Sequence, residues 1–193
     1  MVWARMNQAS INLGGNLTTV HNGGFEDRFL VGDQGFYWHV EPNLPNIVMS
    51  VDDANHQSGA RSLRIDFRGD SDPQSPFLTQ LVLVAPEHRY RMTFFARARE
   101  MVSAGLPVIT IKDASNPTNM ILAQTTSMGS DFADWRELNA EFTTGPQATA
   151  VTIIGGRQSC AERPCPAFGT LWLDSFSIEP VGLTRDADRA KKD

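Results

Sequence analysis

Lysine is scarce in this chain, and long apolar runs are absent. Of the 17 basic residues, fourteen are arginines and only three are lysines, namely Lys112, Lys191 and Lys192. The formal net charge is −5 and no basic stripe runs along the sequence, so we expect no binding to nucleic acid through its phosphates. No segment approaches the roughly 18 consecutive apolar residues of a membrane-spanning helix, so no membrane insertion is expected either.

Cysteine is nearly absent as well. The two cysteines, Cys160 and Cys165, both lie in the segment SCAERPCP. Their spacing suits a small loop closed by a disulfide, although two lone thiols in a loop would give the same sequence. A zinc site would need more ligands than this stretch contains.

Four common sequence signatures of catalytic or nucleotide-binding sites are missing too. The chain has no GxSxG nucleophile elbow, HExxH zinc helix, P-loop or GxGxxG fingerprint. Its four histidines, His21, His39, His56 and His88, are scattered. We therefore expect no enzyme activity. A pair of carboxylates, as in a glycosidase, stays open because only their separation in space would identify it among 22 acidic residues.

What remains is ordinary globular composition, with 41% hydrophobic and 20% charged residues. A chain of 193 residues can bury one core but is short of the length at which cores divide. Residues 1–20 contain a Gly-Gly break and residues 182–193 are polar and charged, so we interpret both as junctions flanking one domain at residues 21–181. The N-terminus lacks a signal-peptide pattern, and we favour a domain cut from a longer chain.

Short segments with alternating apolar and polar residues fill this domain. In RSLRIDF, for example, Leu63, Ile65 and Phe67 share one face. Turn residues separate the segments and helical periodicity is nearly absent, which predicts an all-β, antiparallel jelly-roll sandwich. The expected strands are 46–52, 61–67, 77–84, 88–97, 106–112, 119–125, 135–143, 148–154 and 170–179.

Six stretches in order carry a resemblance to a known family. They are NGGFED (22–27), GFYW (35–38), HQSGARSLRIDF (56–67), TQLVLVAPEHRYRMTFFARA (79–98), WRELNAEFTT (135–144) and GTLWLDSFSIEP (169–180). In this order the chain resembles bacterial carbohydrate-binding modules of families four, nine and twenty-two over about residues 20–180. The resemblance implies a galactose-binding-like jelly roll, in agreement with the alternation.

The resemblance also implies a structural calcium ion. In the related modules, the glutamate of the NGGFE stretch and the aspartate of the last strand help to hold it, and these residues match Glu26 and Asp174. Carbonyl groups of the turn NHQSG would complete the six to eight oxygen ligands that calcium takes. The alternative is that Glu26 is a surface carboxylate and Asp174 a strand-end residue.

For a sugar site the resemblance implies a groove on one sheet. The candidates are side chains expected to face solvent, namely Thr93, Phe95, Arg97, Lys112, Asn139 and Glu141. The alternative is an ordinary solvated sheet face. Trp38 and Trp135 match core positions, and Trp172 shares its parity with Asp174, Phe176 and Ile178. Trp3 lies in the N-terminal segment, so no tryptophan is a clear platform for stacking on a sugar.

These observations predict a non-catalytic glycan-binding accessory domain of a larger secreted or envelope protein, in the extracellular space or the periplasm. Its expected partners are polysaccharide or oligosaccharide and other domains of the same parent protein. The first alternative is a structural or protein-interaction domain, which an apolar patch around Phe95 without an open cleft would favour. The second is a small carbohydrate-active enzyme.

Overall fold

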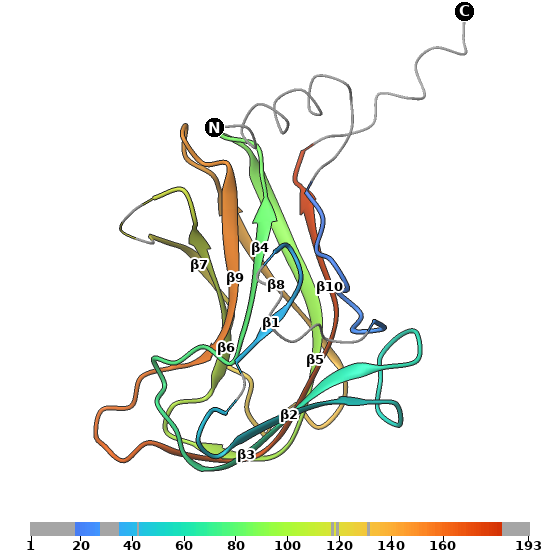
Figure 1. The fold of residues 1–193 in the computed structure, drawn as a ribbon, viewed down its shortest axis with the longest axis vertical. Helices are drawn as coiled ribbons and strands as arrows, with labels where there is room; N and C mark the ends of the chain where they lie inside the picture. Colours follow the sequence, from blue (N-terminus) through green and yellow to red (C-terminus); the bar gives the residue numbers. More distant parts are fainter. Residues whose placement is uncertain are drawn as a thin grey trace, which may run out of the picture.

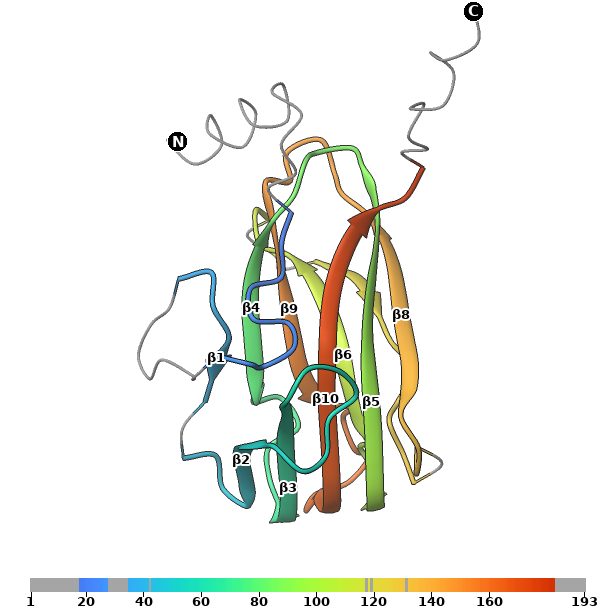
Figure 2. The same ribbon diagram turned by 90° about the vertical axis from the view of Figure 1, so that its right-hand side faces the viewer.

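Within the part of the chain that the structure describes, ten β-strands form two antiparallel five-stranded sheets (Figures 1 and 2). The computed structural model describes residues 18–27, 35–41, 43–116, 118, 120–130 and 132–182. Sheet A has the order β1 (His39–Val40), β4 (Leu78–Leu83), β9 (Ala150–Arg157), β6 (Pro107–Asp113) and β7 (Ile121–Gln124). Sheet B has the order β2 (Ile47–Asp52), β3 (Ser62–Asp70), β10 (Pro166–Pro180), β5 (Arg89–Ser103) and β8 (Arg136–Thr143).

The two sheets pack face to face around a single apolar core. In β3, Leu63, Ile65 and Phe67 are buried in that core, whereas Arg64 and Asp66 between them face outward. Such alternation follows from the pleat of a strand with one face in a core and one in solvent. The predicted jelly-roll fold is confirmed. No described segment forms a helix long and apolar enough to cross a membrane.

The expected strand segments agree with the observed strands, with differences at their ends. The long strands β5 and β10 extend beyond the predicted 88–97 and 170–179, and β1 was not expected. Residues 1–17 and 183–193 lie outside the described residues, so most of both predicted junction segments lies outside them too. The loop between β9 and β10 contains a disulfide between Cys160 and Cys165.

The face assigned to Trp172 was wrong. Its ring is only 2% exposed, as expected, but it lies on the outer face of sheet B, opposite Arg64 on β3 and Arg97 on β5. The reason is a bulge in β10 between Asp174 and Ser177, which breaks the alternation of sides. Phe176, beyond the start of this bulge, lies in the core.

The other two tryptophans that were assigned to core positions differ from each other. Trp38 is 2% exposed and lies in the core, as predicted. Trp135, just before β8, is only partly buried. Its expected core position is therefore not found, because the first residues of β8 lie at the margin of sheet B, where β8 is the last strand.

Candidate functional site

A hollow of about 320 Å³ opens on the outer face of sheet A. It lies over β1, β4 and β9, where short side chains such as Thr79 and Thr152 leave room above the backbone. The Tyr37 side chain lies at its edge and is 46% exposed. The residues that line the hollow are Gly35, Tyr37, His39, Thr79, Gln80, Leu81 and Thr152.

Packing beneath the hollow holds Tyr37 in place. The next residue, Trp38, is buried and donates its indole N–H to the backbone oxygen of Asn22 at 3.0 Å. The buried Gln80 side chain accepts from the backbone N–H of His21 and donates to its carbonyl, both at 2.9 Å. The His21 ring lies 5.4 Å from the Tyr37 ring. The rim of the hollow is therefore fastened to β4 and to the core.

A row of outward-facing side chains continues from the hollow across all five strands of sheet A. The cross-strand pairs run from β1 through β4, β9 and β6 to β7. Four strand spacings make this row about 19 Å long. At its far end, Gln124 donates to Thr110 Oγ1 at 2.9 Å. The row consists of His39, Thr79, Ile154, Thr110 and Gln124.

This surface combines one exposed aromatic ring with hydroxyl, imidazole and amide groups. An aromatic ring can stack on a flat apolar face of a ligand, and the polar groups can bind its hydroxyl groups. No carboxylate is among the described residues that line the hollow. Such a surface can bind a neutral, hydroxyl-rich molecule. The Glu41 carboxylate lies outside this lining, with Oε2 3.5 Å from His39 Nε2.

Five of the six residues predicted to bind ligand lie on the other side of the sandwich. Lys112 alone lies on sheet A, on β6 opposite Thr152 of β9. The outer face of sheet B carries Thr93, Phe95 and Arg97 on β5 and Asn139 and Glu141 on β8. The six residues therefore do not form one surface.

Some of the five predicted residues on sheet B form hydrogen bonds or ion pairs with neighbouring side chains. Thr93 shares a hydrogen bond of 2.8 Å with Ser177. Arg91 and Arg89 both donate to the Glu141 carboxylate, and these hydrogen bonds hold the pKa of Glu141 below its usual value. A shallow cavity of about 250 Å³ lies beside Arg91 and Thr93. Its lining includes no aromatic side chain among the described residues.

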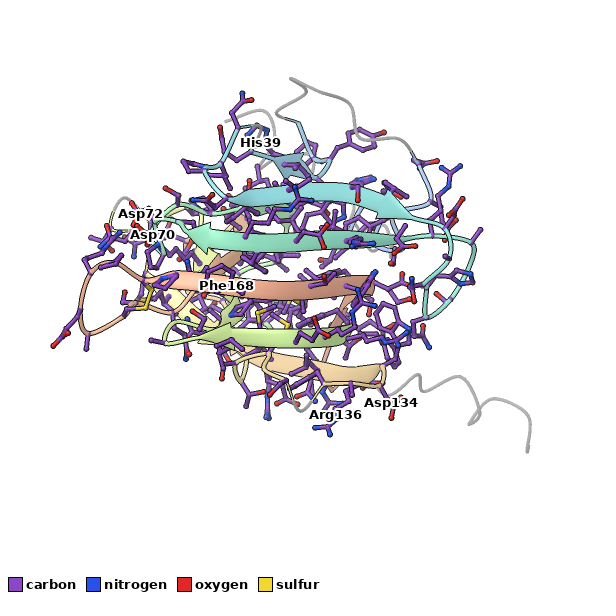
Figure 3. All side chains as sticks on the ribbon, turned by 90° about the horizontal axis from the view of Figure 1, so that it is seen from below. His39, Asp70, Asp72, Asp134, Arg136 and Phe168 are labelled. Carbon is purple, nitrogen blue, oxygen red and sulfur yellow. A yellow bond between two sulfur atoms is a disulfide. The ribbon has the colours of Figure 1, made fainter. Side chains whose placement is uncertain are left out.

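The buried Trp172 ring on sheet B lies beneath three arginines. The guanidinium carbons of Arg64, Arg97 and Arg99 lie 5.7, 5.6 and 5.6 Å from its centroid. Each cation–π contact of this kind contributes about 0.5 to 1 kcal/mol at exposed sites. Figure 3 looks onto this sheet, with Phe168 labelled near the start of β10. The arginines cover the indole, so Trp172 offers no face for a sugar.

The edge of the same indole binds a carboxylate. Trp172 Nε1 donates to Asp52 Oδ2 at 2.8 Å. Burial raises the pKa of Asp52, but hydrogen bonds from Trp172, Ala54 and Asn55 outweigh this effect and hold the pKa below its usual value. Asp52 is therefore a fixed negative charge at the end of β2 near neutral pH.

The carboxylates of Glu26 and Asp174, the predicted calcium ligands, both lie near Gly24. A Cβ atom on Gly24 would be 3.7 Å from Asp174 Oδ1 and 3.9 Å from Glu26 Oε1. Asp174 Oδ2 accepts the backbone N–H groups of Gln57 and Ser58, at 2.8 and 3.1 Å. The turn expected to supply carbonyl groups thus presents N–H groups to this carboxylate.

Glu26 binds the same turn further along. Its Oε1 atom accepts the backbone N–H groups of Ala60 and Arg61, at 2.9 and 3.2 Å. The other oxygens nearby include the hydroxyls of Ser58 and Ser175, which share a hydrogen bond of 2.7 Å. Two carboxylates and neutral oxygens are the donor types that calcium prefers, so the residues fit such an ion in kind. Among the described residues, no cluster of three or more acidic, histidine or cysteine side chains is found for a metal.

Two antiparallel sheets and a lined hollow on one outer face define a jelly-roll β-sandwich of the ligand-binding kind. A family model described as a carbohydrate binding domain matches residues 17–154, and the chain belongs to this family. The predicted resemblance is thereby confirmed. No curated protein sequence is similar enough to the chain to count as a match.

Solved structures support the fold. A CBM4 structure is 15% identical, with a TM-score of 0.58 over 83% of this chain and 99% of that one. TmCBM61 in complex with β-1,4-galactotriose is 17% identical, with a TM-score of 0.54 and coverage of 86% and 99%. The Clostridium thermocellum endo-1,4-β-D-xylanase 10B CBM22-1–GH10 modules, complexed with xylohexaose, are 11% identical at a TM-score of 0.54. This chain is covered to 86% but spans only 29% of that xylanase chain.

The hollow itself was not predicted, although the sequence does indicate that residues of its floor face outward. Thr79, Leu81 and Thr152 alternate with buried neighbours, as outward-facing residues should. What alternation could not reveal is that β4 and β9 are neighbours while β5 and β8 lie in the opposite sheet. Tyr37 stood in the quoted GFYW stretch, directly before Trp38, which matches a core position.

Proposed function

We propose that this domain is a non-catalytic module that binds a neutral polysaccharide or oligosaccharide in the hollow on sheet A. The observation that carries this proposal is the exposed Tyr37 ring beside a floor of threonine and histidine side chains. Membership of a carbohydrate binding domain family supports it. The relatives complexed with xylohexaose and β-1,4-galactotriose indicate which oligosaccharides to try first.

In this proposal the side chains have separate roles. Tyr37 stacks on the apolar face of one sugar ring, and His39, Thr79 and Thr152 bind hydroxyl groups of the same or the next sugar. The row of outward-facing side chains that ends at Gln124 would contact the glycan as it extends across sheet A. Lys112, beside Thr152, is the one member of the predicted ligand-binding set that this site would use.

The first prediction concerns Tyr37. We expect Tyr37→Ala to weaken oligosaccharide binding about tenfold, because removal of a stacked ring costs about 1.4 kcal/mol. Isothermal titration calorimetry with xylohexaose, galactotriose and longer glycans would measure this loss. Phe168→Ala is the matched control, since Phe168 is a 50% exposed ring on the other sheet.

The outcomes separate the two faces of the sandwich. An unchanged affinity in Tyr37→Ala would contradict the sheet A site. If Phe95→Ala lost binding instead, the site would lie on sheet B, where Thr93, Phe95, Arg97, Asn139 and Glu141 were predicted. Failure of every glycan to bind correctly folded protein would favour a structural or protein-interaction domain. Two observations favour ligand binding over that alternative. The hollow on sheet A is open, and the Phe95 side chain is half-buried and not fully exposed.

The accessory role belongs to the same proposal. A module of this kind keeps an attached protein near its polysaccharide and raises the effective concentration without cleaving bonds. The absence of a carboxylate among the described residues lining the hollow supports binding over hydrolysis. An extracellular or periplasmic location agrees with the disulfide between Cys160 and Cys165, since such bonds persist in oxidising compartments.

We further propose that Glu26 and Asp174 hold a structural calcium ion. At a dissociation constant of about 10⁻⁴ M, 10 mM calcium would stabilise the fold by about 2.7 kcal/mol, or about 5 to 10 °C in Tm. Differential scanning calorimetry in calcium and in EDTA would measure this rise. Glu26→Gln and Asp174→Asn keep an oxygen for the backbone N–H groups but lose the charge, so we expect the rise to disappear.

Two controls accompany the calcium experiment. Magnesium at the same concentration tests general ionic effects, and Asp72→Asn removes a carboxylate that is remote from the site and 49% exposed. An equal Tm in calcium and EDTA would reject the metal site. It would leave a pair of carboxylates that only fasten the turn at residues 57–61 through backbone N–H groups.

A further inference from the structure

We propose that the outer face of sheet B carries a second site, which binds the anionic groups of an acidic polysaccharide. The site is defined by the guanidinium groups of Arg64, Arg97 and Arg99 around the Trp172 ring. It lies on the opposite sheet from the Tyr37 hollow. It goes beyond the proposed neutral-glycan site, because it assigns a different ligand chemistry to a different face.

The three guanidinium groups are held in place before any ligand binds. All three lie within 5.7 Å of the centroid of one ring, which is itself 2% exposed. That ring is fixed at its edge by Asp52. Arg97 is also oriented by its donation to the Ala133 carbonyl at 3.0 Å. Binding an anion here would cost less side-chain ordering than binding to three separate, freely rotating arginines.

The arginines around Trp172 differ in their ion pairs. Arg64 pairs with Asp66 at 3.0 Å, and Arg68 reaches the same carboxylate at 3.6 Å. Among the described residues, no ion pair involves Arg97 or Arg99. Their known polar contacts are those of Arg97 with the Ala133 carbonyl and with Asn55 Oδ1. Arg64 and Arg68 thus share the Asp66 carboxylate, whereas Arg97 and Arg99 keep their charges outside any ion pair of the described residues.

The basic residue type in the sheet B site, arginine rather than lysine, indicates which anions it would bind. Arginine offers a planar fork of donors that matches a carboxylate or sulfate group with two parallel hydrogen bonds, whereas lysine does not. All three basic residues of the sheet B site are arginines, and the site lies on the open face of a sheet. An extended chain with spaced oxyanions and many hydroxyl groups therefore fits it best.

The test uses polygalacturonate as a carboxylate polymer, dextran sulfate as a sulfate polymer and neutral galactan, each measured at 20 mM and at 500 mM NaCl. We expect wild-type protein to bind an acidic polymer at low salt and to lose at least tenfold in affinity at high salt. Arg99→Gln should weaken this binding several-fold and Arg97→Gln/Arg99→Gln more than tenfold. Arg163→Gln, which removes an exposed arginine on the disulfide loop, should leave it unchanged.

Near-ultraviolet circular dichroism would verify that each variant is folded. Arg99→Lys keeps the positive charge but removes the planar guanidinium, so its affinity would show how much of the binding depends on that planar group. Preference for polygalacturonate over dextran sulfate assigns carboxylates, and the reverse assigns sulfates. The proposal is overturned if neither polymer binds, if the double variant binds as wild type does, or if only vesicles with anionic lipid bind. Tyr37→Ala, measured with neutral oligosaccharides, reports separately on the sheet A site.

Discussion

Replacing Phe176 by alanine is expected to lower the free energy of unfolding by about 3 to 5 kcal/mol. Phe176 is 4% exposed and its ring meets three others. It stacks on Phe94 at 4.6 Å and meets Trp38 edge-on at 5.0 Å and Phe25 at 6.0 Å. A cavity left by its removal cannot close easily, because these rings are held by both sheets and by the N-terminal segment of the domain.

Urea-induced unfolding of both proteins would measure this effect. Phe168→Ala provides the matched control, because Phe168 lies on the same strand but is 50% exposed. We expect a loss below about 1 kcal/mol for that variant. Similar losses in both variants would mean that the aromatic cluster around Phe176 does not stabilise the fold as proposed.

The same cluster connects stability to the ligand site. The backbone N–H of Phe176 donates to the Gly23 carbonyl at 2.9 Å, which fastens the segment at residues 18–27 to β10. Trp38 packs on Phe176 and immediately follows Tyr37 in the chain. Loosening of the cluster should therefore disturb the rim of the hollow on sheet A as well as the core beneath it.

Alternation predicted which side chains of a strand share a face, but only where the strand is regular. In β3 the faces of Leu63 and Arg64 were correct. In β10 the same reasoning placed Trp172 with Phe176, because a bulge is not visible in the pattern of residue types. Ser175, at φ 56°, is the residue at which the alternation changes. The arginine cluster over Trp172 could not be foreseen for the same reason.

Contacts between distant strands were harder still to predict. Lys112 and Thr93 both alternate as outward residues, yet they lie on opposite sheets. Local sequence carries no information on which sheet a strand joins, since both sheets bury one face and expose the other. The proximity of Glu26 and Asp174 was available only through the family resemblance. Tyr37 adjoins a two-residue strand, which is too short for alternation to identify.

Replacing Arg157 by methionine is expected to cost about 3 to 5 kcal/mol, although the variant keeps most of the side-chain volume. Arg157 is 6% exposed, and burial lowers the pKa of its guanidinium. It donates to the backbone carbonyls of Gly105, Ser71 and Cys165 at 3.0, 3.1 and 2.7 Å. Methionine has no donor, so buried carbonyls of three separate segments would lose a partner.

Chemical denaturation with Arg163→Met as control would decide this point. Arg163 lies in the disulfide loop that follows β9 and pairs with Asp72, but it is 58% exposed, so its removal should cost less than about 1 kcal/mol. Arg157→Lys should lie between the two, because one ammonium group cannot reach all three carbonyls. Equal stability of Arg157→Met and wild type would show that water replaces the guanidinium. Otherwise Arg157 is the group that joins the ends of β3, β5 and β9 to the disulfide loop.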